Sequence, residues 1–562
     1  MAQMQEIQDA AKKSKARAAP STTQKKGKSV QISKLDELSK NVIEYFQDSD
    51  AILITTKEEL HDYITKVIEF GECAIDTETT GLDRQYDWIL GTSIYYEGGK
   101  EAYIPCKHRL PIFETLYPGQ LSYEDVGEEY QRLVDAKVKT DWANADFDLA
   151  MIKKDFKVDF MDVVYWDVIS AWRTLKENEP KKDLKHLYNK YVMKGVGDPK
   201  KFSDFFTPDL FPYCKPEVAK LYAAHDAKIT YELKKWQMPY VTKDNPKCIQ
   251  HGLQAVADLC WYVEMPMIKV CQELHRNGMY IDQDMANILK KRYGDALKAE
   301  YDKLYSMLED AFDNATVTSK KPKPFVSVRD FNPNSTPHVS WLCYDFLMFD
   351  PGKKASTDKD VLRTFNHPIV NQILRIRSLV TLISTFVEKI PNSVGPDGRI
   401  HGDFLSCGAD TGRMSSKSPN MQNIPSKNKD IRRMFRAKSG YVLLSSDYSQ
   451  QEPKLTAYIS QDANMIRSFQ ENKDIYSFIA AIAFNRSYED CLENRPTGEF
   501  DNEGKPIVVY QPDGKARRGE AKSVVLGRPC VYAPSSGISH IRPMMKNLVN
   551  HIAYGCAASM LC

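Results

Sequence analysis

The sequence lacks a CxxC pair, a long apolar run and any substantial net charge. Twelve cysteines without such a pair argue against a zinc site or a disulfide framework and predict reduced thiols. No run approaches the roughly 18 apolar residues of a membrane span, and the polar N-terminus has no signal-peptide core, so we expect a cytoplasmic chain without a membrane partner. With a formal charge of +2, any nucleic-acid site must be a local groove.

The chain has the length and patterning of several packed units. One core rarely exceeds about 250–300 residues, and the chain has 562. Residues 1–40 are rich in Lys, Ser and Ala, which predicts a disordered polar tail; the alternative is a nonspecific phosphate-binding arm. Residues 41–245 alternate short β-type runs with helical periods, as an α/β domain does. Residues 246–395 have mainly helical spacing.

Two acidic side chains follow a β-type run in "CAIDTETTGLD". The two-residue period of a strand points Asp76 and Glu78 to the same face. Carboxylate oxygens are hard ligands that suit Mg²⁺ or Mn²⁺. On its own, such a pair is more typical of a solvated strand edge.

Two later segments add carboxylates at helical spacing. Asn144 and Asp148 lie four residues apart in "WANADFDLAM", and Tyr222 and Asp226 do so in "LYAAHDAKITYEL". With Asp76 and Glu78, these carboxylates can hold two divalent ions about 3.5–4 Å apart, one activating water and the other stabilising a leaving 3′ oxygen. Tyr222 would orient the attacking water. Asn144 could equally be a helix cap.

This pattern resembles the tyrosine-bearing branch of the DEDD 3′–5′ exonucleases, as found in the proofreading domain of family A (DNA polymerase I-like) polymerases. The resemblance implies an RNase H-like α/β domain, a mixed sheet with flanking helices, that acts on single-stranded DNA 3′ ends. The implied catalytic and metal-binding residues are Asp76, Glu78, Asp148 and Asp226, with Tyr222 catalytic and Asn144 in contact with DNA.

A second group of motifs begins at "DTGRMSSKSPNMQNIPSK". This stretch resembles the family A motif that contacts primer and template, and it implies DNA contacts by Arg413, Gln422 and Asn423. By itself, a Gly-Arg in a Ser- and Pro-rich loop more often marks a turn. The order of the motifs favours the functional interpretation.

The stretch "LLSSDYSQQEPKLTAYIS" predicts a buried strand that ends at Asp447, then a helix with Pro453 in its first turn. It resembles motif A of family A polymerases. The resemblance implies that Asp447 and the backbone carbonyl of Tyr448 bind two magnesium ions. It also implies that Glu452 blocks a ribose 2′-hydroxyl and so selects deoxynucleotides.

Arg518 and Lys522 are four residues apart in "RRGEAKSVVLG" and would project from one helix face. Two such cations can clamp a triphosphate, although an isolated basic pair is usually a solvated face. The segment resembles motif B of the fingers and implies deoxynucleoside triphosphate binding. Leu526 stands where the family has an aromatic residue, and Tyr476 stands where it commonly has a histidine.

The resemblance stops at Gly527. Residues 528–562 contain no Asp or Glu, and no His-Asp-Glu motif C follows motif B. We expect that the sequence leaves the polymerase frame here through a frameshift or read-through; a natural divergent end is the alternative. Without motif C, Asp447 alone would hold the two metal ions, and from one side only.

The resemblance therefore implies a phage-like or bacterial family A replicase, in a bacterial cell or a phage-infected host cytoplasm, with an intact exonuclease and an incomplete α+β polymerase. The expected polymerase units are a helical thumb (246–395), a partial palm (396–480), the start of the fingers (481–527) and a non-family tail (528–562). Expected partners are primer-template DNA, deoxynucleoside triphosphates, two Mg²⁺ or Mn²⁺ per site and a second polypeptide with motif C and the remaining fingers. A stand-alone 3′–5′ exonuclease and a non-catalytic DNA-binding fragment are the alternatives.

Overall fold

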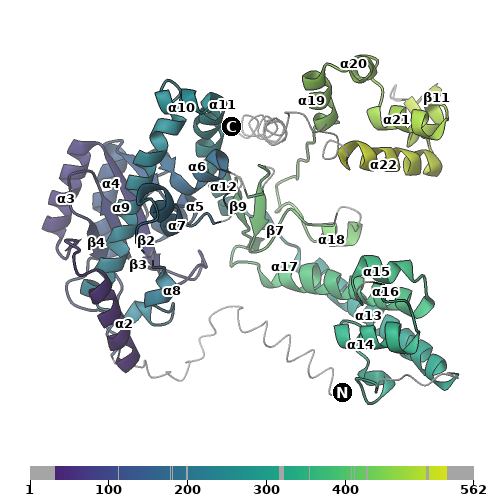
Figure 1. Cartoon of the computed structure of the whole chain (residues 1–562), viewed down its shortest axis with the longest axis horizontal. Helices are drawn as coiled ribbons and strands as arrows, with labels where there is room; N and C mark the ends of the chain where they lie inside the picture. Colours follow the sequence, from purple (N-terminus) through teal and green to yellow (C-terminus); the bar gives the residue numbers. More distant parts are fainter. Residues whose placement is uncertain are drawn as a thin grey trace.

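The protein is described from a computed structural model (Figure 1). The structure describes residues 32–527, apart from residues 112, 177–178, 180, 198–199, 315–321, 353–354, 407, 410–411, 426–427 and 502–505. Part of the predicted polar tail is ordered, because Ile32–Tyr45 forms helix α2 and buries Leu35 and Val42. The predicted non-family tail lies outside the described residues.

A six-stranded mixed sheet forms the centre of the first region. Its strands are β1 (Ile52–Leu53), β2 (Glu72–Thr79), β3 (Ile89–Tyr95), β4 (Ala102–Pro105), β5 (Lys139–Trp142) and β6 (Val164–Asp167), in the order β1-β4-β3-β2-β5-β6. Strand β2 is interior, pairing antiparallel with β3 and parallel with β5. The α/β fold predicted for this region is confirmed.

Helices flank this sheet, and the longest of them, α9, contacts β2, β3 and β4. The helical segments are α3 (Lys57–Phe70), α4 (Tyr123–Asp135), α5 (Ala145–Asp155), α6 (Val168–Leu175), α7 (Leu184–Leu187), η1 (Tyr188–Val192), α8 (Phe202–Phe205), η2 (Phe211–Tyr213) and α9 (Pro216–Val241). The core between sheet and helices includes the fully buried side chains of Trp142, Trp166 and Trp172.

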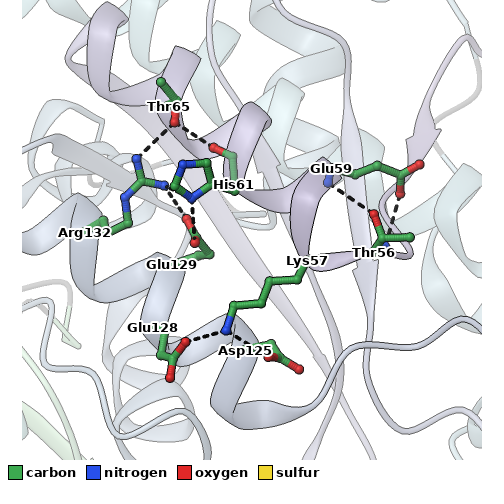
Figure 2. A network of polar contacts seen from close by, with 9 residues as sticks. All are labelled: Thr56, Lys57, Glu59, His61, Thr65, Asp125, Glu128, Glu129 and Arg132. Atoms are coloured by element: carbon green, nitrogen blue, oxygen red, sulfur yellow. Dashed lines mark hydrogen bonds and ion pairs between the residues drawn. The ribbon is translucent and has the colours of Figure 1, made fainter.

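Figure 2 shows the polar contacts that join α3 to α4. Thr56 and Glu59 form a capping box at the start of α3. Lys57 Nζ lies 2.6 Å from Glu128 Oε2 on α4. His61 Nδ1 lies 3.0 Å from Glu129 Oε1. The capping box provides acceptors for backbone N–H groups at the start of α3, and the ion pairs join α3 to α4.

The helices after α9 belong partly to the same core. They are α10 (Pro246–Gln250), α11 (Gln254–Leu259), η3 (Cys260–Glu264) and α12 (Met265–Asn277). Their residues Cys248, Cys260 and Ile268 lie in the hydrophobic cluster that includes the sheet. The thumb-like region predicted from residue 246 therefore begins with helices that pack on the first region. The eight described cysteines are buried and form no disulfide with one another.

A separate helical core follows (Figure 1). Its segments are α13 (Gln283–Asp313), η4 (Val328–Asp330), α14 (Thr336–Ser340), η5 (Trp341–Phe346), α15 (Lys359–Thr364), α16 (Pro368–Leu382), η6 (Ile383–Glu388) and α17 (Lys389–Asn392). Within the described ranges, Pro368–Asn392 is the one helical stretch long and apolar enough to cross a membrane. Its Ile373 and Ile376 are buried in the cluster that contains Leu304 of α13, so packing within the protein accounts for part of this apolar character.

The palm-like region contains only short strands among its described residues. These are β7 (Met279–Tyr280) with β8 (Arg399–Ile400), and β9 (Asp403–Leu405) with β10 (Ser415–Lys417), followed by α18 (Lys429–Arg433). The buried strand predicted before Asp447 is wrong: residues 441–447 have no regular structure, and Val442 and Leu444 are 89% and 93% exposed. No described strand pairs with this segment, so its apolar side chains have nothing to pack against.

The last described region contains α19 (Gln451–Ser460), α20 (Ala463–Gln470), α21 (Ile475–Phe484), η7 (Glu489–Cys491) and α22 (Pro512–Gly527). Pro453 lies in the first turn of α19, as predicted. The stretch before α22 forms an exposed hairpin of β11 (Asn494–Phe500) and β12 (Pro506–Tyr510).

Polar contacts join the first region to the palm-like region. Arg84, in the loop after β2, forms ion pairs with Asp146 of α5 and with Asp403 of β9, the latter at 3.4 Å. Gln272 Nε2 of α12 donates to Asp146 Oδ1 at 2.8 Å. The loop that follows β2 is thereby anchored to the strand that precedes Arg413.

Candidate active site

Three carboxylates converge at the face of β2 that α9 covers. Asp76 and Glu78 alternate with the buried Thr77 on β2, so they share one face, and Asp226 comes from α9. One oxygen from each lies within 4.8 Å of the others. Three hard oxygen donors this close fit a divalent cation such as Mg²⁺ or Mn²⁺. The structure therefore brings together three of the four predicted carboxylates as one possible metal-binding group.

The fourth carboxylate, Asp148, is held beside this group by Thr77. Its Oδ1 accepts hydrogen bonds from Thr77 Oγ1 at 2.5 Å and from Thr77 N at 3.2 Å. Asp148 lies in the first turn of α5 and is buried. The charge of Asp148 is the next largest cause, after burial, of the raised pKa of Asp76. Asp148 thus belongs electrostatically to the site although its oxygens are not among the convergent three.

Asp167 positions α5, a role that was not predicted from the sequence. Its Oδ2 accepts from Ala145 N at 2.6 Å, and its Oδ1 caps α6 by accepting from Ser170 N at 2.8 Å. Asn144 occupies the N-cap position of α5 at φ 74°, but its side chain makes no capping bond. Asp167 thus supplies the side-chain acceptor at the start of α5. The signal available in the sequence was an Asp between an apolar strand and a helix.

Burial and nearby negative charges raise the pKa values of Asp76, Glu78 and Asp148. Desolvation, followed by the negative charge of Asp226, raises the pKa of Glu78 to about 8. Desolvation raises the pKa of Asp148 to about 7, although the hydrogen bonds from Thr77 act to lower it. The buried Asp226 Oδ1 is paired with Lys185 Nζ at 3.1 Å. A bound cation would offset the remaining repulsion among the carboxylates, so the donor set fits a metal.

Tyr222 lies one helical turn before Asp226 on α9, as predicted, and contacts Lys185 of α7. Burial and then the charge of Asp226 raise the pKa of Tyr222, which keeps the phenol protonated. Lys185 Nζ contacts the Tyr222 hydroxyl and lies 3.1 Å from Asp226 Oδ1. Because an ammonium group only donates, the Tyr222 oxygen accepts from Lys185 and its own proton is left for another acceptor. Lys185 was missed because its sequence context shows only a basic helix.

The polymerase motifs are arranged less completely. Arg413 forms an ion pair with Glu452 in the first turn of α19, so these two predicted residues are brought together. Asp447 and Tyr448 lie outside any helix or strand and are exposed. Gln422 and Asn423 occupy an exposed turn.

Arg518 and Lys522 share one face of α22, as predicted. The Arg518 guanidinium lies 5.3 Å and Lys522 Nζ 5.6 Å from the centroid of the Tyr476 ring. Arg518 also donates two hydrogen bonds to Asp474, at 2.9 and 3.0 Å. Leu526 lies in the last turn of α22, and its side chain is outside the described residues.

The mixed sheet carries two carboxylates on an interior strand and others from flanking helices, the arrangement that the resemblance to 3′–5′ exonuclease domains implies. The sequence profile of the 3′–5′ exonuclease family matches residues 51–236, and that of DNA polymerase family A matches residues 302–495. The chain therefore belongs to the family A DNA polymerases and carries a 3′–5′ exonuclease domain.

Relatives are found among the bacterial DNA polymerases I. The chain is 28% identical over 454 residues to that of Borreliella burgdorferi (78% of this chain, 45% of the relative). It is 27% identical over 487 residues to that of Pseudomonas aeruginosa (83% and 48%). A solved structure, the POL domain of Pol1 from M. smegmatis in complex with DNA primer-template and dNTP, matches with a TM-score of 0.59 at 18% identity, covering 89% of this chain and 76% of that one. That likeness concerns the fold. The chain spans about half or less of the length of these curated relatives.

Proposed function

We propose that the chain hydrolyses DNA from the 3′ end with divalent metal ions, as the proofreading exonuclease of a family A polymerase. The observation that supports this best is the convergence of Asp76, Glu78 and Asp226 within 4.8 Å beside a protonated tyrosine. A solvated strand edge would not bury its carboxylates against a helix that adds a third.

In this proposal Asp76, Glu78, Asp148 and Asp226 hold two Mg²⁺ or Mn²⁺ ions. When bound, such ions supply an activated water and stabilise the leaving oxygen. The Tyr222 hydroxyl donates a hydrogen bond to the attacking water or to a phosphate oxygen and so orients it. Asp167 fixes the first turn of α5, and thereby Asp148.

The test is degradation of a 5′-labelled single-stranded oligonucleotide by the purified chain with Mg²⁺. We expect shortening from the 3′ end, lowered at least about 100-fold in Asp76→Ala, since one electrostatic group at a reacting centre contributes about 10²–10³-fold. The matched control is Asp162→Ala, an aspartate of the same region whose side chain is 87% exposed. Equal activity in all three proteins would refute the assignment.

We further propose that DNA synthesis requires carboxylates of motif C, whichever chain supplies them. Arg518 and Lys522 would then clamp a deoxynucleoside triphosphate, Asp447 would hold the ions and Glu452 would exclude ribose. The exposed apolar side chains before Asp447 support the need for a further strand to cover them, which no described segment provides. Primer extension by the purified chain above trace level would contradict this proposal.

A further inference from the structure

Helix α2 lies before the part of the chain that matches the exonuclease family. The family profile begins at residue 51, whereas α2 ends at Tyr45 and is followed directly by Phe46. The helix contacts α8 and α9. Its buried Val42 and the partly buried Phe46 belong to the hydrophobic cluster that contains Tyr222 of α9. A segment outside the matched residues is therefore packed against the helix that carries the tyrosine of the site.

The Phe46 ring packs edge-on against the Tyr222 ring. The two ring centroids lie 6.5 Å apart at an interplanar angle of 86°. The Phe46 ring also lies 5.8 Å from the ring of His225 on α9 and 5.8 Å from that of Phe205 on α8. Aromatic rings favour edge-to-face pairs at centroid separations of about 4.5–7 Å. Phe46 thus forms one wall of the enclosure around Tyr222 and joins it to two helices.

The other walls of this enclosure come from within the matched residues. The rings of Phe202, Phe205 and Phe206 lie 5.9, 6.1 and 5.9 Å from that of Tyr222. Lys185 Nζ lies 3.5 Å from the centroid of the Tyr222 ring and contacts its hydroxyl. The Tyr222 side chain is buried, so these neighbours fix the direction of its hydroxyl. Because interiors are close-packed, removal of one wall leaves space into which the ring can tilt.

Resting on the proposed function, we infer that Phe46 is a positioning residue for Tyr222. It holds the phenol ring so that the hydroxyl points toward the attacking water or the phosphate oxygen at the carboxylates. The role requires no contact between Phe46 and the DNA, and it makes α2 part of the nuclease although α2 lies outside the family match. A side chain that only filled the core would change stability and leave the step that Tyr222 assists unaltered.

The test is a double-mutant cycle in the full chain, with degradation of a 5′-labelled single-stranded oligonucleotide in Mg²⁺ as the readout. Phe46→Ala should lower kcat about 10- to 100-fold at an unchanged KM, the scale for a small misplacement of a group at a reacting centre. Tyr222→Phe, which removes the hydroxyl, should lower kcat at least as much. The double variant should lose no more than Tyr222→Phe alone, because residues that act as a unit are not additive.

Further variants separate positioning from stability. Phe46→Leu keeps most of the apolar volume and should recover part of the kcat that Phe46→Ala loses. Ile43→Ala, at a side chain of α2 that is 50% exposed, is the matched control and should equal the wild type. Mn²⁺ binding, measured by electron paramagnetic resonance, should be retained in Phe46→Ala, which shows that the carboxylate group is still formed.

Three results would overturn the inference and leave the proposed function standing: a wild-type kcat in Phe46→Ala, a wild-type kcat in Tyr222→Phe, or losses that multiply in the double variant. Loss of Mn²⁺ binding in Phe46→Ala would also overturn it, because Phe46 would then support the whole site rather than Tyr222. If the wild type degrades no oligonucleotide, the proposed function fails and the inference fails with it.

Discussion

Asp76 and Asp447 both follow short apolar runs in the sequence, but only Asp76 lies in a strand. Strand β2 is flanked by β3 and β5, and its Ile75 is 1% exposed. The segment before Asp447 has no described strand beside it, and its apolar residues face solvent. The comparison shows that an apolar run becomes a strand when neighbours satisfy its backbone and cover its side chains. The carboxylate group around Asp76 is thus preformed, whereas no described strand holds Asp447 in place.

The largest expected difference between the two segments is in amide hydrogen exchange. Amides of residues 73–77 should exchange at least about 10³-fold more slowly than those of residues 441–447, because core strands open with free energies approaching global stability, about 5–15 kcal/mol. Exchange followed by mass spectrometry measures this. Similar protection in the two segments would break the comparison.

A matched pair of substitutions sharpens the comparison between the segments before Asp76 and Asp447. Ile75→Ala should lower the free energy of unfolding of the exonuclease region by about 2–5 kcal/mol, because it leaves a cavity in a packed core. Leu444→Ala should stay within about 0.5 kcal/mol, as for surface substitutions. Denaturant unfolding followed by the fluorescence of the buried tryptophans reports both; a large cost at Leu444 would mean that this segment is packed.

Two helix-capping aspartates, Asp167 in the exonuclease region and Asp282 at the start of α13, test whether Asp167 positions Asp148. Asp167→Ala should cost about 1–3 kcal/mol, since it leaves buried backbone donors unpaired, and should lower nuclease kcat about 10- to 100-fold by displacing Asp148. Asp167→Asn should recover part of the rate. Asp282→Ala removes the cap of α13, whose Met285 N lies 2.9 Å from Asp282 Oδ1, and should leave the nuclease rate unaltered. Equal nuclease loss in both Ala variants would argue against a local role for Asp167.

The smallest expected effect concerns pH in the metal-free protein. The folded pKa of Glu78, about 8, is raised above its unfolded value, so the folded state binds more protons and stability falls as pH rises from about 5 to 8. Glu78→Gln removes this loss. It should raise Tm at pH 8 by about 2–4 °C for each kcal/mol of unfolding free energy that is regained. At pH 5 the increase should be smaller. A Tm difference that is the same at both pH values would contradict the electrostatic cause. Added Mg²⁺ should stabilise the wild type more than the variant.

Local periodicity predicted the parts of the site that a single element defines. The two-residue period placed Asp76 and Glu78 on one face, and the four-residue spacing placed Tyr222 with Asp226 and Arg518 with Lys522. It could not reveal Lys185 or Asp167, because their roles arise from elements that meet only in the fold. It also predicted a strand before Asp447, because a sequence window carries no information on whether partner strands are present.

Metal binding tests the central claim most directly. Mn²⁺ binding to the metal-free protein would be measured by electron paramagnetic resonance for the wild type, Asp76→Ala and Asp447→Ala. The account predicts that Asp76→Ala loses the tight binding and that Asp447→Ala keeps it, because among the described residues only the carboxylates around Asp76 converge. Loss in Asp447→Ala with retention in Asp76→Ala would contradict it.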